Sequence, residues 1–434
     1  MMQRVFILDS ARTPIAPRGG ALRNLSLKSM GAALLEELLA RSGLTASDIH
    51  GATLGNALAA GGNPARLVAL AAGLPQAIPA QTIDTQCCSG LDAIAMSAER
   101  LAQSDQPLCW IAGGMESAST APLRARRGHD GSLNFFDEAE FSPFSDRNPT
   151  VEESVLSLEN WLHRTQSIAR EEHWHYAVRS HRLAEDSPNA DRIQVSLEVG
   201  GSLNHDPHLR RLTLRACARA EGVEGGGTAA TGAKATKASI GQHQSHQVGG
   251  SSNAPKVSYR LNPALVAPLA DGSAASILVN ESWRQGNGAG TVSGSMMSGS
   301  MTEIIASTQV GGDPAWPALA VDSLLPWLER ILSRSLHGDA SAPGLAIELM
   351  ESFTAQAIAN RIVLEAALSR WKIPFEINSH GGLLALGHPI GASGAVLVSR
   401  LVHRLHPGQL GLALIPSAGG LASALLMRRE WSAS

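Results

Sequence analysis

The segment SGLDAIAMSAERL (Ser89–Leu101) has a counterpart near the other end of the chain, SGAVLVSRLVHRL (Ser393–Leu405). Both open with Ser-Gly, carry apolar residues at helical spacing and end in Arg-Leu. Each is followed by an apolar run typical of a buried strand, LCWIAGG (Leu108–Gly114) after the first and LALIPSAGG (Leu412–Gly420) after the second. A helix and a strand repeated in this way predict a fold of two similar halves. The alternative is a chance similarity between two amphipathic helices.

The rest of the chain alternates between strand-like and helix-like segments. The apolar run Arg4–Asp9 predicts a short buried strand, and Leu108–Ala112 predicts another. Residues 27–41 and 89–104 carry apolar side chains at helical spacing and predict helices. Alternating strands and helices are typical of a layered α/β fold.

A less regular region separates the two halves. Residues 152–190 have helical patterns, whereas residues 222–257 form a low-complexity tract with almost no large apolar side chain. Such a tract buries too little surface to offset the entropy lost on ordering, so we expect a mobile surface loop. It contains His243 and His246, and a metal site is the alternative to a polar loop there.

The composition is that of an ordinary globular protein. Of the 434 residues, 44% are hydrophobic and 17% are charged, and the formal net charge of −3 gives no basic excess that would indicate nucleic-acid binding. The densest basic cluster, Arg124–Arg127, is too short for more than a solvated turn or a contact with a ligand phosphate. The apolar run Val5–Leu8 is too short for a signal peptide or a membrane span, so we expect no membrane association.

The four cysteines stand at positions 87, 88, 109 and 217, and their spacing is not that of a metal-binding framework. The adjacent pair Cys87 and Cys88 cannot easily form a disulfide with each other. We therefore expect a reduced, soluble, cytoplasmic protein without a metal site.

The first candidate for chemistry is Cys87, in the stretch DTQCCSGLDAIA. It comes just before Ser-Gly at the predicted start of an apolar helix. The unsatisfied N–H groups and the positive dipole end of a helix N-terminus favour thiolate over thiol. Cys87 is therefore a candidate nucleophile at neutral pH. The alternative is two buried structural cysteines, because cysteine often serves as a small hydrophobic residue.

The second candidate is His388, in NSHGGLLALGHPIGASGA (Asn378–Ala395). Its glycines let the backbone approach a ligand closely, and Pro389 fixes the chain beside the histidine. A histidine held in this way suits proton transfer to a thiol or thioester. The alternative is a helix-entry loop that happens to contain a histidine.

These two motifs resemble those of the thiolase family. TQCCSGLDAIA is similar to the family's nucleophile motif, and GHPIGASGA matches its histidine motif nearly letter for letter. Further stretches fall in thiolase order: SARTP, GNPARLVALAAGLP, AGGMESAS, APLADGSAA, ELMESFTAQAIA and PSAGGLASALLMRR. The resemblance covers most of the chain, although the tract 222–257 is not typical of the family.

The resemblance implies an acyltransferase in which Cys87 takes an acyl group from a thioester. It implies that His388 activates this cysteine, and that the backbone N–H groups of Cys87 and Ala418 form an oxyanion hole for acylation. Cys88 occupies a place usually held by a small residue, so Cys87 is the better candidate. No metal or redox cofactor is implied, and coenzyme A would serve as a substrate carrier.

Two further family positions differ in this chain. The family's Asn-Glu-Ala-Phe motif falls on Met350–Phe353, so an asparagine that helps to organise an oxyanion site is replaced by Met350, which has no donor. The family's second cysteine, the base that removes the α-proton, falls on Pro416 in an ungapped alignment. A one-residue shift of the alignment would place Ser417 there. His380 is another possible substitute base, and the alternative is that His380 is a loop histidine that supports packing.

Three functions follow from the resemblance and these differences. The first is an acyltransferase that loads Cys87 from an acyl-CoA or a carrier-protein thioester and passes the acyl group to an acceptor, in a condensation that needs no second-cysteine base. The second is a standard thiolase that makes or cleaves 3-ketoacyl-CoA. The third is a non-catalytic thiolase-like subunit of a hetero-oligomer.

The resemblance also implies an architecture of five layers, α-β-α-β-α, built from two similar halves and an inserted loop domain. We expect the N-terminal half to comprise residues 1–119 and about 258–280, the loop domain residues 120–257, and the C-terminal half residues 281–434. Cys87 and His388 would meet between the halves. A homodimer or homotetramer is expected.

Overall fold

The computed structural model describes residues 2–59, 61–136, 151–188, 190–197, 201–220, 261–287, 301–314, 317–335, 344–371 and 374–431. The low-complexity tract 222–257, with His243 and His246, lies outside the described residues. So do residues 288–300.

The described strands form one large mixed sheet with two small separate hairpins. The order along the large sheet is β13-β12-β14-β15-β11-β1-β10-β5-β3-β4, and β2 (Ala16–Pro17) pairs with β10. Its N-terminal strands are β1 (Val5–Arg12), β3 (Gly51–Gly55), β4 (Ala80–Ile83), β5 (Cys109–Ser117) and β10 (Ala270–Asn280). Its C-terminal strands are β11 (Thr302–Gly311), β12 (Leu345–Leu349), β13 (Phe375–Ile377), β14 (Leu410–Ser417) and β15 (Leu421–Arg429).

The two groups of strands have the same pairing pattern. In the first, β3 pairs parallel with β4 and β5, and β10 pairs antiparallel with β5 and β1. In the second, β12 pairs parallel with β13 and β14, and β15 pairs antiparallel with β14 and β11. Among the described strands, only a three-residue pairing of Val5–Ile7 with Thr302–Ile304 joins them. The prediction of two similar halves is therefore confirmed.

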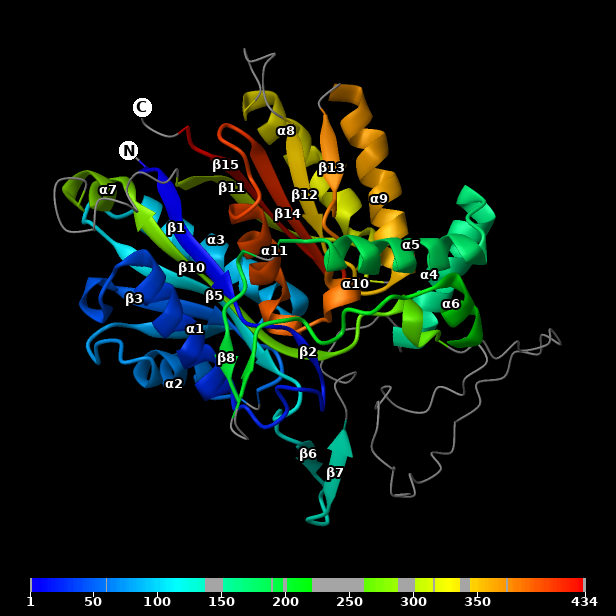
Figure 1. Ribbon diagram of the computed structural model, residues 1–434, viewed down its shortest axis with the longest axis horizontal. Helices are drawn as coiled ribbons and strands as arrows, with labels where there is room; N and C mark the ends of the chain where they lie inside the picture. Colours follow the sequence, from blue (N-terminus) through cyan, green and yellow to red (C-terminus); the bar gives the residue numbers. More distant parts are fainter. Residues whose placement is uncertain are drawn as a thin grey trace.

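Three separate hydrophobic clusters show that the helices and sheets alternate in layers. The first lies between the N-terminal strands and the helices α1 (Leu27–Ser42) and α2 (Pro64–Ala71). The second surrounds α3 (Ser89–Ala102) and α11 (Ser393–Val402), which pack against each other and against strands of both halves. The third lies between the C-terminal strands and α8 (Leu325–Ser335) and α9 (Thr354–Leu368). The predicted α-β-α-β-α order is thus present (Figure 1).

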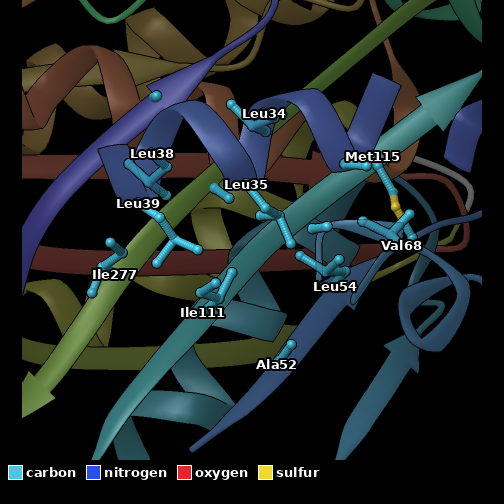
Figure 2. Close-up of a cluster of buried hydrophobic side chains, with 14 of the residues drawn as sticks. Leu34, Leu35, Leu38, Leu39, Ala52, Leu54, Val68, Ile111, Met115 and Ile277 are labelled. Atoms are coloured by element: carbon cyan, nitrogen blue, oxygen red, sulfur yellow. The ribbon is translucent and has the colours of Figure 1, made fainter. Parts of the chain in front are cut away.

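The outer helix α1 illustrates why these residues form a helix. The side chain of Ser26 accepts a hydrogen bond from Ser29 N–H at 3.1 Å and caps the N-terminus. Gly43 ends the helix with φ of 66°, a conformation that favours glycine. Leucines of α1 pack onto β3, β5 and β10, as Figure 2 shows for Leu35, Leu54 and Ile111.

Strand β5 is longer than the sequence predicted, because it continues through Gly113 and Gly114 to Ser117. A Cβ atom on Gly113 would lie 2.2 Å from the carbonyl oxygen of Ala274 on the paired strand. One on Gly114 would lie 2.2 Å from Gly391 O. The glycines mark close backbone approaches within the strand, not its end.

The region between the halves contains the predicted helices and two small hairpins. It comprises β6 (Arg124–Arg127), β7 (Leu133–Phe136), α4 (Val151–Gln166), α5 (Arg170–Glu185), β8 (Val195–Ser196), β9 (Ser202–Leu203) and α6 (Leu214–Ala220). The cluster Arg124–Arg127 is therefore a strand and not a turn. The remaining helices are α7 (Glu281–Asn287) and α10 (Leu383–Leu386). Within the described ranges, no helix is both long and apolar enough to cross a membrane.

A buried ion cluster ties this region to β1. Arg12 is fully buried and donates to Asp191 at 2.8 Å and to both carboxylate oxygens of Asp206 at 2.8 and 3.0 Å. Asp206 also accepts from Arg192 and from Ile15 N–H. Burial raises the pKa of Asp206, but the charge of Arg12 and the hydrogen bonds outweigh it and hold that pKa at about 2.

We predict that Asp206→Asn destabilises the protein near neutral pH by about 3 kcal/mol, because Arg12 loses one of its two buried counter-ions. The folded pKa of about 2 lies below the ordinary value of 3.8, so the stabilisation is present above about pH 4 and is lost as the pH falls through 2. Urea unfolding of both proteins from pH 7 to pH 2 should show the difference narrowing at low pH.

The exposed ion pair between Arg211 and Glu185, at 3.4 Å, offers a control. Glu185→Gln should change the free energy of unfolding by less than about 1 kcal/mol. A difference between wild type and Asp206→Asn that stays constant down to pH 2 would contradict the electrostatic account.

Candidate active site

Cys87 lies on a sharp turn between β4 and α3. The preceding residue, Gln86, has φ of 58°, a left-handed conformation that costs a non-glycine residue about 1–3 kcal/mol. Hydrogen bonds hold the turn: Gln86 N–H donates to Asp84 Oδ1 at 3.0 Å, and Ser89 Oγ donates to Gln86 O at 2.6 Å. The turn presents the Cys87 side chain, half-buried, at the N-terminal end of α3.

His388 comes from the other half of the molecule and meets this cysteine. The distance from Cys87 Sγ to His388 Nε2 is 3.3 Å. The other ring nitrogen, Nδ1, lies 2.7 Å from Ser393 Oγ. When Nδ1–H donates to Ser393, the lone pair of Nε2 faces the thiol, which is the arrangement a general base requires.

Backbone hydrogen bonds fix the histidine loop to the N-terminal half. His388 N–H donates to Pro268 O at 2.8 Å, and Ala270 N–H donates to His388 O at 3.1 Å. Pro268 and Ala270 both belong to the segment APLADGSAA. This segment falls in thiolase order, but the sequence alone indicated no function for it. The structure thus brings the two predicted catalytic residues together through contacts between distant segments.

The resting state of the pair is a neutral thiol beside a neutral imidazole. Burial raises the pKa of Cys87 to about 11, although hydrogen bonds from Ser417 and from backbone N–H groups lower it. Burial also lowers the pKa of His388 to about 4. The sequence favoured a thiolate because of the helix N-terminus. The pKa of Cys87 opposes that expectation, because the loss of water around the sulfur outweighs the hydrogen bonds that stabilise a thiolate.

The end of β14 and the residue after it also contribute groups to the surroundings of the sulfur. Cys87 N–H donates to Ser417 Oγ at 3.2 Å, and hydrogen bonds from Ser417 and from Ala418 N–H lower the pKa of the thiol. The backbone N–H groups of Cys87 and Ala418 therefore both lie at the sulfur. The resemblance assigned these two groups to the oxyanion hole.

Cys88 faces away from the site. It is fully buried, its Sγ donates to Ile415 O at 3.3 Å, and burial raises its pKa far above the ordinary thiol value. A thiol that is neither exposed nor ionised is a poor nucleophile. Of the two adjacent cysteines, the geometry favours Cys87.

The resemblance marks two positions as altered: Met350, directly after β12, and Pro416, on the neighbouring strand β14. Met350, at the end of β12, is fully buried in the central hydrophobic cluster against which Cys87 packs. Pro416 and Ser417 are successive residues of β14, whose side chains point to opposite faces. The side chain of this strand that contacts Cys87 is that of Ser417. A one-residue shift of the alignment would place this same serine at the position of the family's second cysteine.

His380 lies in a separate hydrogen-bond network. Its Nδ1 is 3.2 Å from Ser379 Oγ, and burial and the charge of Arg400 lower its pKa. Arg400 is itself buried and paired with Glu348 at 3.0 Å. In the described part of the chain, no hydrogen bond links the His380 imidazole to Cys87 or His388.

Glu351 anchors the loop region to the C-terminal half. Its carboxylate accepts from Tyr176 Oη–H at 2.7 Å and Ser180 Oγ–H at 2.8 Å, both on α5, and from Asn378 Nδ2–H at 2.8 Å. It also accepts from Leu384 N–H at 3.3 Å, so this carboxylate has a structural role and no acceptor position to spare for a substrate. The residues that the structure does describe contain no group of three or more His, Cys, Asp or Glu side chains placed to hold a metal ion.

Sequence reasoning gave no role to Ser393 and left that of Ser417 open. Ser393 belongs to the quoted histidine motif, and its spacing of five residues from His388 was the available signal. Only a packed structure shows that it contacts the imidazole. Ser417 contacts Cys87 across 330 positions of sequence.

Comparison with known proteins shows the family of the chain. The family model "Thiolase, N-terminal domain" matches residues 5–198, and "Thiolase, C-terminal domain" matches residues 344–429. A provisionally named acetyl-CoA C-acetyltransferase of Staphylococcus epidermidis is 30% identical, with 99% of each chain covered. A 3-oxoadipyl-CoA/3-oxo-5,6-dehydrosuberyl-CoA thiolase of Escherichia coli is 29% identical, covering 99% of this chain and 100% of its own.

Solved structures are similar over the same length. The Acat5 thiolase of Ascaris suum in complex with coenzyme A has a TM-score of 0.73 at 26% identity, covering 98% of this chain and 100% of its own. A Bacillus anthracis acetyl-CoA acetyltransferase has a TM-score of 0.74 at 23% identity, with 99% of both chains covered, and shows the shared fold. From its motifs, its repeated halves and these relatives, the chain belongs to the thiolase family and is an acyltransferase.

Proposed function

We propose that the chain carries an acyl group on Cys87, taken from an acyl-CoA or a carrier-protein thioester, and passes it to an acceptor without a second-cysteine base. The observation that carries the proposal is the 3.3 Å contact between Cys87 Sγ and His388 Nε2. The N–H groups of Cys87 and Ala418 beside the sulfur support it.

Acylation follows from this arrangement. As the sulfur of Cys87 attacks the thioester carbonyl carbon, the thiol proton moves to Nε2 of His388. The carbonyl oxygen becomes an oxyanion, and the N–H groups of Cys87 and Ala418 would stabilise it once Cys87 N–H leaves Ser417 Oγ. The bond from carbon to the leaving sulfur then breaks, and His388 returns its proton to the departing thiolate. A neutral pair suits this sequence, since His388 begins as a base.

The second half-reaction distinguishes this chain within its family. With Met350 and Pro416 at the altered positions, neither the oxyanion asparagine nor the second cysteine is available. Loss of a general base costs about 10²–10⁴ in rate, and loss of an oxyanion donor about 10²–10³. Ser417 contacts Cys87, but a serine hydroxyl is a poor base. Acceptors that need no deprotonation at carbon avoid both losses, such as a decarboxylating malonyl-type thioester, an activated carbanion, an amine or an alcohol.

The second candidate function is the standard thiolase reaction, which the names of the relatives favour.

We predict that the wild-type protein forms an acyl adduct on Cys87 when it is incubated with a panel of acyl-CoA and carrier-protein thioesters. We also predict that it cleaves acetoacetyl-CoA with free CoA at a rate near that of Cys87→Ala. Intact-protein mass spectrometry measures the adduct, and loss of acetoacetyl-CoA absorbance measures thiolysis.

Thiolysis well above the Cys87→Ala background would establish the standard reaction and remove the proposed one. An unmodified wild-type protein across the whole panel would remove both and leave the non-catalytic subunit. That third reading also requires an obligatory thiolase-like partner to copurify with the chain.

Coenzyme A enters this proposal as a carrier of substrate, not as a resident cofactor, and no metal is required. We place the protein in the cytoplasm, in keeping with four cysteines that are all free in the structure.

A homodimer is also proposed. The edge strand β4 ends next to the Cys87 turn and pairs only with β3 in the described chain. Leu67 and Leu70 on α2 are 58% and 42% exposed, and Met96 on α3 is 51% exposed. A second copy paired along β4 would cover an unpaired edge, and these apolar side chains lie on helices that pack against that strand. Sedimentation of the purified chain tests this.

A further inference from the structure

Four glycines meet behind the Cys87–His388 pair, with backbone packed directly against backbone. They lie at the end of β3, at the start of α3, in β5 and in the histidine loop: Gly55, Gly90, Gly114 and Gly391. A Cβ atom added to Gly55, Gly90 or Gly114 would lie 2.7, 2.8 or 2.2 Å from Gly391 O. The helix that follows the nucleophile therefore touches the loop that bears the base without an intervening side chain.

One buried carboxylate links the segments that meet at this junction. Glu116, at the end of β5, is 1% exposed. Its Oε2 accepts from Ala57 N–H and from Gly391 N–H, each at 3.0 Å. Its Oε1 accepts from Asn56 Nδ2–H at 2.7 Å and from Leu58 N–H at 3.2 Å. A carboxylate offers about four acceptor positions, and donors from two distant segments use them.

We propose that Glu116 is a positioning residue that sets the approach of His388 to Cys87 by holding the loop of Gly391 against residues 56–58. The inference rests on the proposed acylation of Cys87. Gly391 lies three residues after His388 and two before Ser393, so its N–H anchors the loop between the base and the hydroxyl that orients it. Reaction rates fall steeply when reacting groups move, by as much as about 10²-fold for 1 Å.

The four donors around Glu116 explain why a carboxylate is needed. A glutamine would turn its own amide N–H groups toward one pair of donors, so either Gly391 and Ala57 or Asn56 and Leu58 would lose an acceptor. Burial raises the pKa of Glu116 to about 7, although N–H groups of Ala57, Gly391 and Leu58 lower it. Protonation has the same effect as the amide, because it converts one acceptor into a donor.

The charge of Glu116 also reaches the nucleophile, since it raises the pKa of Cys87. Removing the charge should therefore have two opposed effects. The thiol should ionise at a lower pH, while acylation should slow because His388 is misplaced. A residue that only stabilised the fold would not produce this combination.

The experiment uses Glu116→Gln in the full-length protein, with Asp271→Asn as the matched control. Asp271 is a buried carboxylate on the neighbouring strand β10 that accepts from Ser119 N–H and Oγ–H and has further hydrogen bonds with Ser117 and Ala118. The acylation rate of Cys87 with acetyl-CoA and with the best thioester of the panel is measured by intact-protein mass spectrometry. The pH midpoint of Cys87 alkylation by iodoacetamide is measured separately, with thermal unfolding as a check on folding.

For Glu116→Gln we expect acylation to slow about 10- to 100-fold and the alkylation midpoint to move to lower pH, while Asp271→Asn leaves both close to wild type. Acylation within twofold of wild type, or an unshifted midpoint, would overturn the inference. If the wild type accepts no acyl group, the proposed function fails, and the alkylation midpoint still decides the role of Glu116.

A second variant covers the case in which Glu116→Gln does not fold. In Gly391→Ala, the new Cβ would lie 2.8 Å from Asn56 Cα and 2.9 Å from Glu116 Oε2, which pushes the histidine loop away from Glu116 with the carboxylate unchanged. We expect the same slowing of acylation. Wild-type acylation in this variant would overturn the positioning role.

Discussion

Replacing Cys87 with alanine should remove the acyl adduct completely, because the sulfur that forms the thioester is gone. Loss of a nucleophile that acts together with its base costs about 10⁶ in rate in enzymes of comparable design. No other cysteine can replace it: Cys88, Cys109 and Cys217 are fully buried. Mass spectrometry of the protein after incubation with acyl-CoA should therefore show only the unmodified chain.

Cys88→Ser provides the matched control. The serine hydroxyl can keep the hydrogen bond that Cys88 Sγ donates to Ile415 O, so the fold and the Cys87 turn should persist. This variant should load an acyl group at the wild-type rate. An adduct that survives Cys87→Ala, or disappears in Cys88→Ser, would mean that the nucleophile has been assigned to the wrong residue.

Replacing His388 with alanine should slow acylation by about 10²–10⁴, the usual effect of removing a positioned general base. The pH dependence should change as well. Because the pKa of His388 is about 4 and that of Cys87 about 11, the wild type has its base ready and its thiol protonated throughout the alkaline range below pH 10. Its acylation rate should be nearly level from pH 7.5 to 9.5.

Without His388, the reaction depends on the small fraction of free thiolate. The rate of His388→Ala should rise about tenfold for each pH unit up to the pKa of the thiol. His380→Ala serves as the control, because its imidazole hydrogen-bonds to Ser379 and not to the pair. A level profile in His388→Ala, or a comparable loss in His380→Ala, would contradict the assigned base.

Much of the fold was predictable because its helices and strands have recognisable local sequence patterns. The repeated helix and strand segments at the two ends predicted two similar halves, and the predicted helices over 27–41 and 89–104 form within one or two residues. The predicted strand Leu108–Ala112 stopped before Gly113 and Gly114, which β5 includes. Their neighbours Ala274 and Gly391 lie far away in sequence, so nothing local revealed the close approach.

The candidate site divides in the same way. Cys87 and His388 stand in short, distinctive motifs, so the residues could be named before any contact was known. The ionisation state could not, since the pKa of Cys87 depends on how much water the folded chain removes from the sulfur. The hydrogen bonds that lower this pKa come partly from Ser417 and Ala418, which lie far away in sequence.

The sequence alone determined the family, the two-half architecture, and the cysteine and histidine that the chemistry would use. Motif spacing and helical periodicity are properties of residues that are near in sequence, so they can be recognised before the fold is known. Only the tertiary structure decided that Ser417 and not Pro416 faces the thiol, that Ser393 orients His388, and that Glu116 holds Gly391. Each of these depends on which way a side chain points and on what another segment brings to it, and both are fixed by packing between distant parts of the chain.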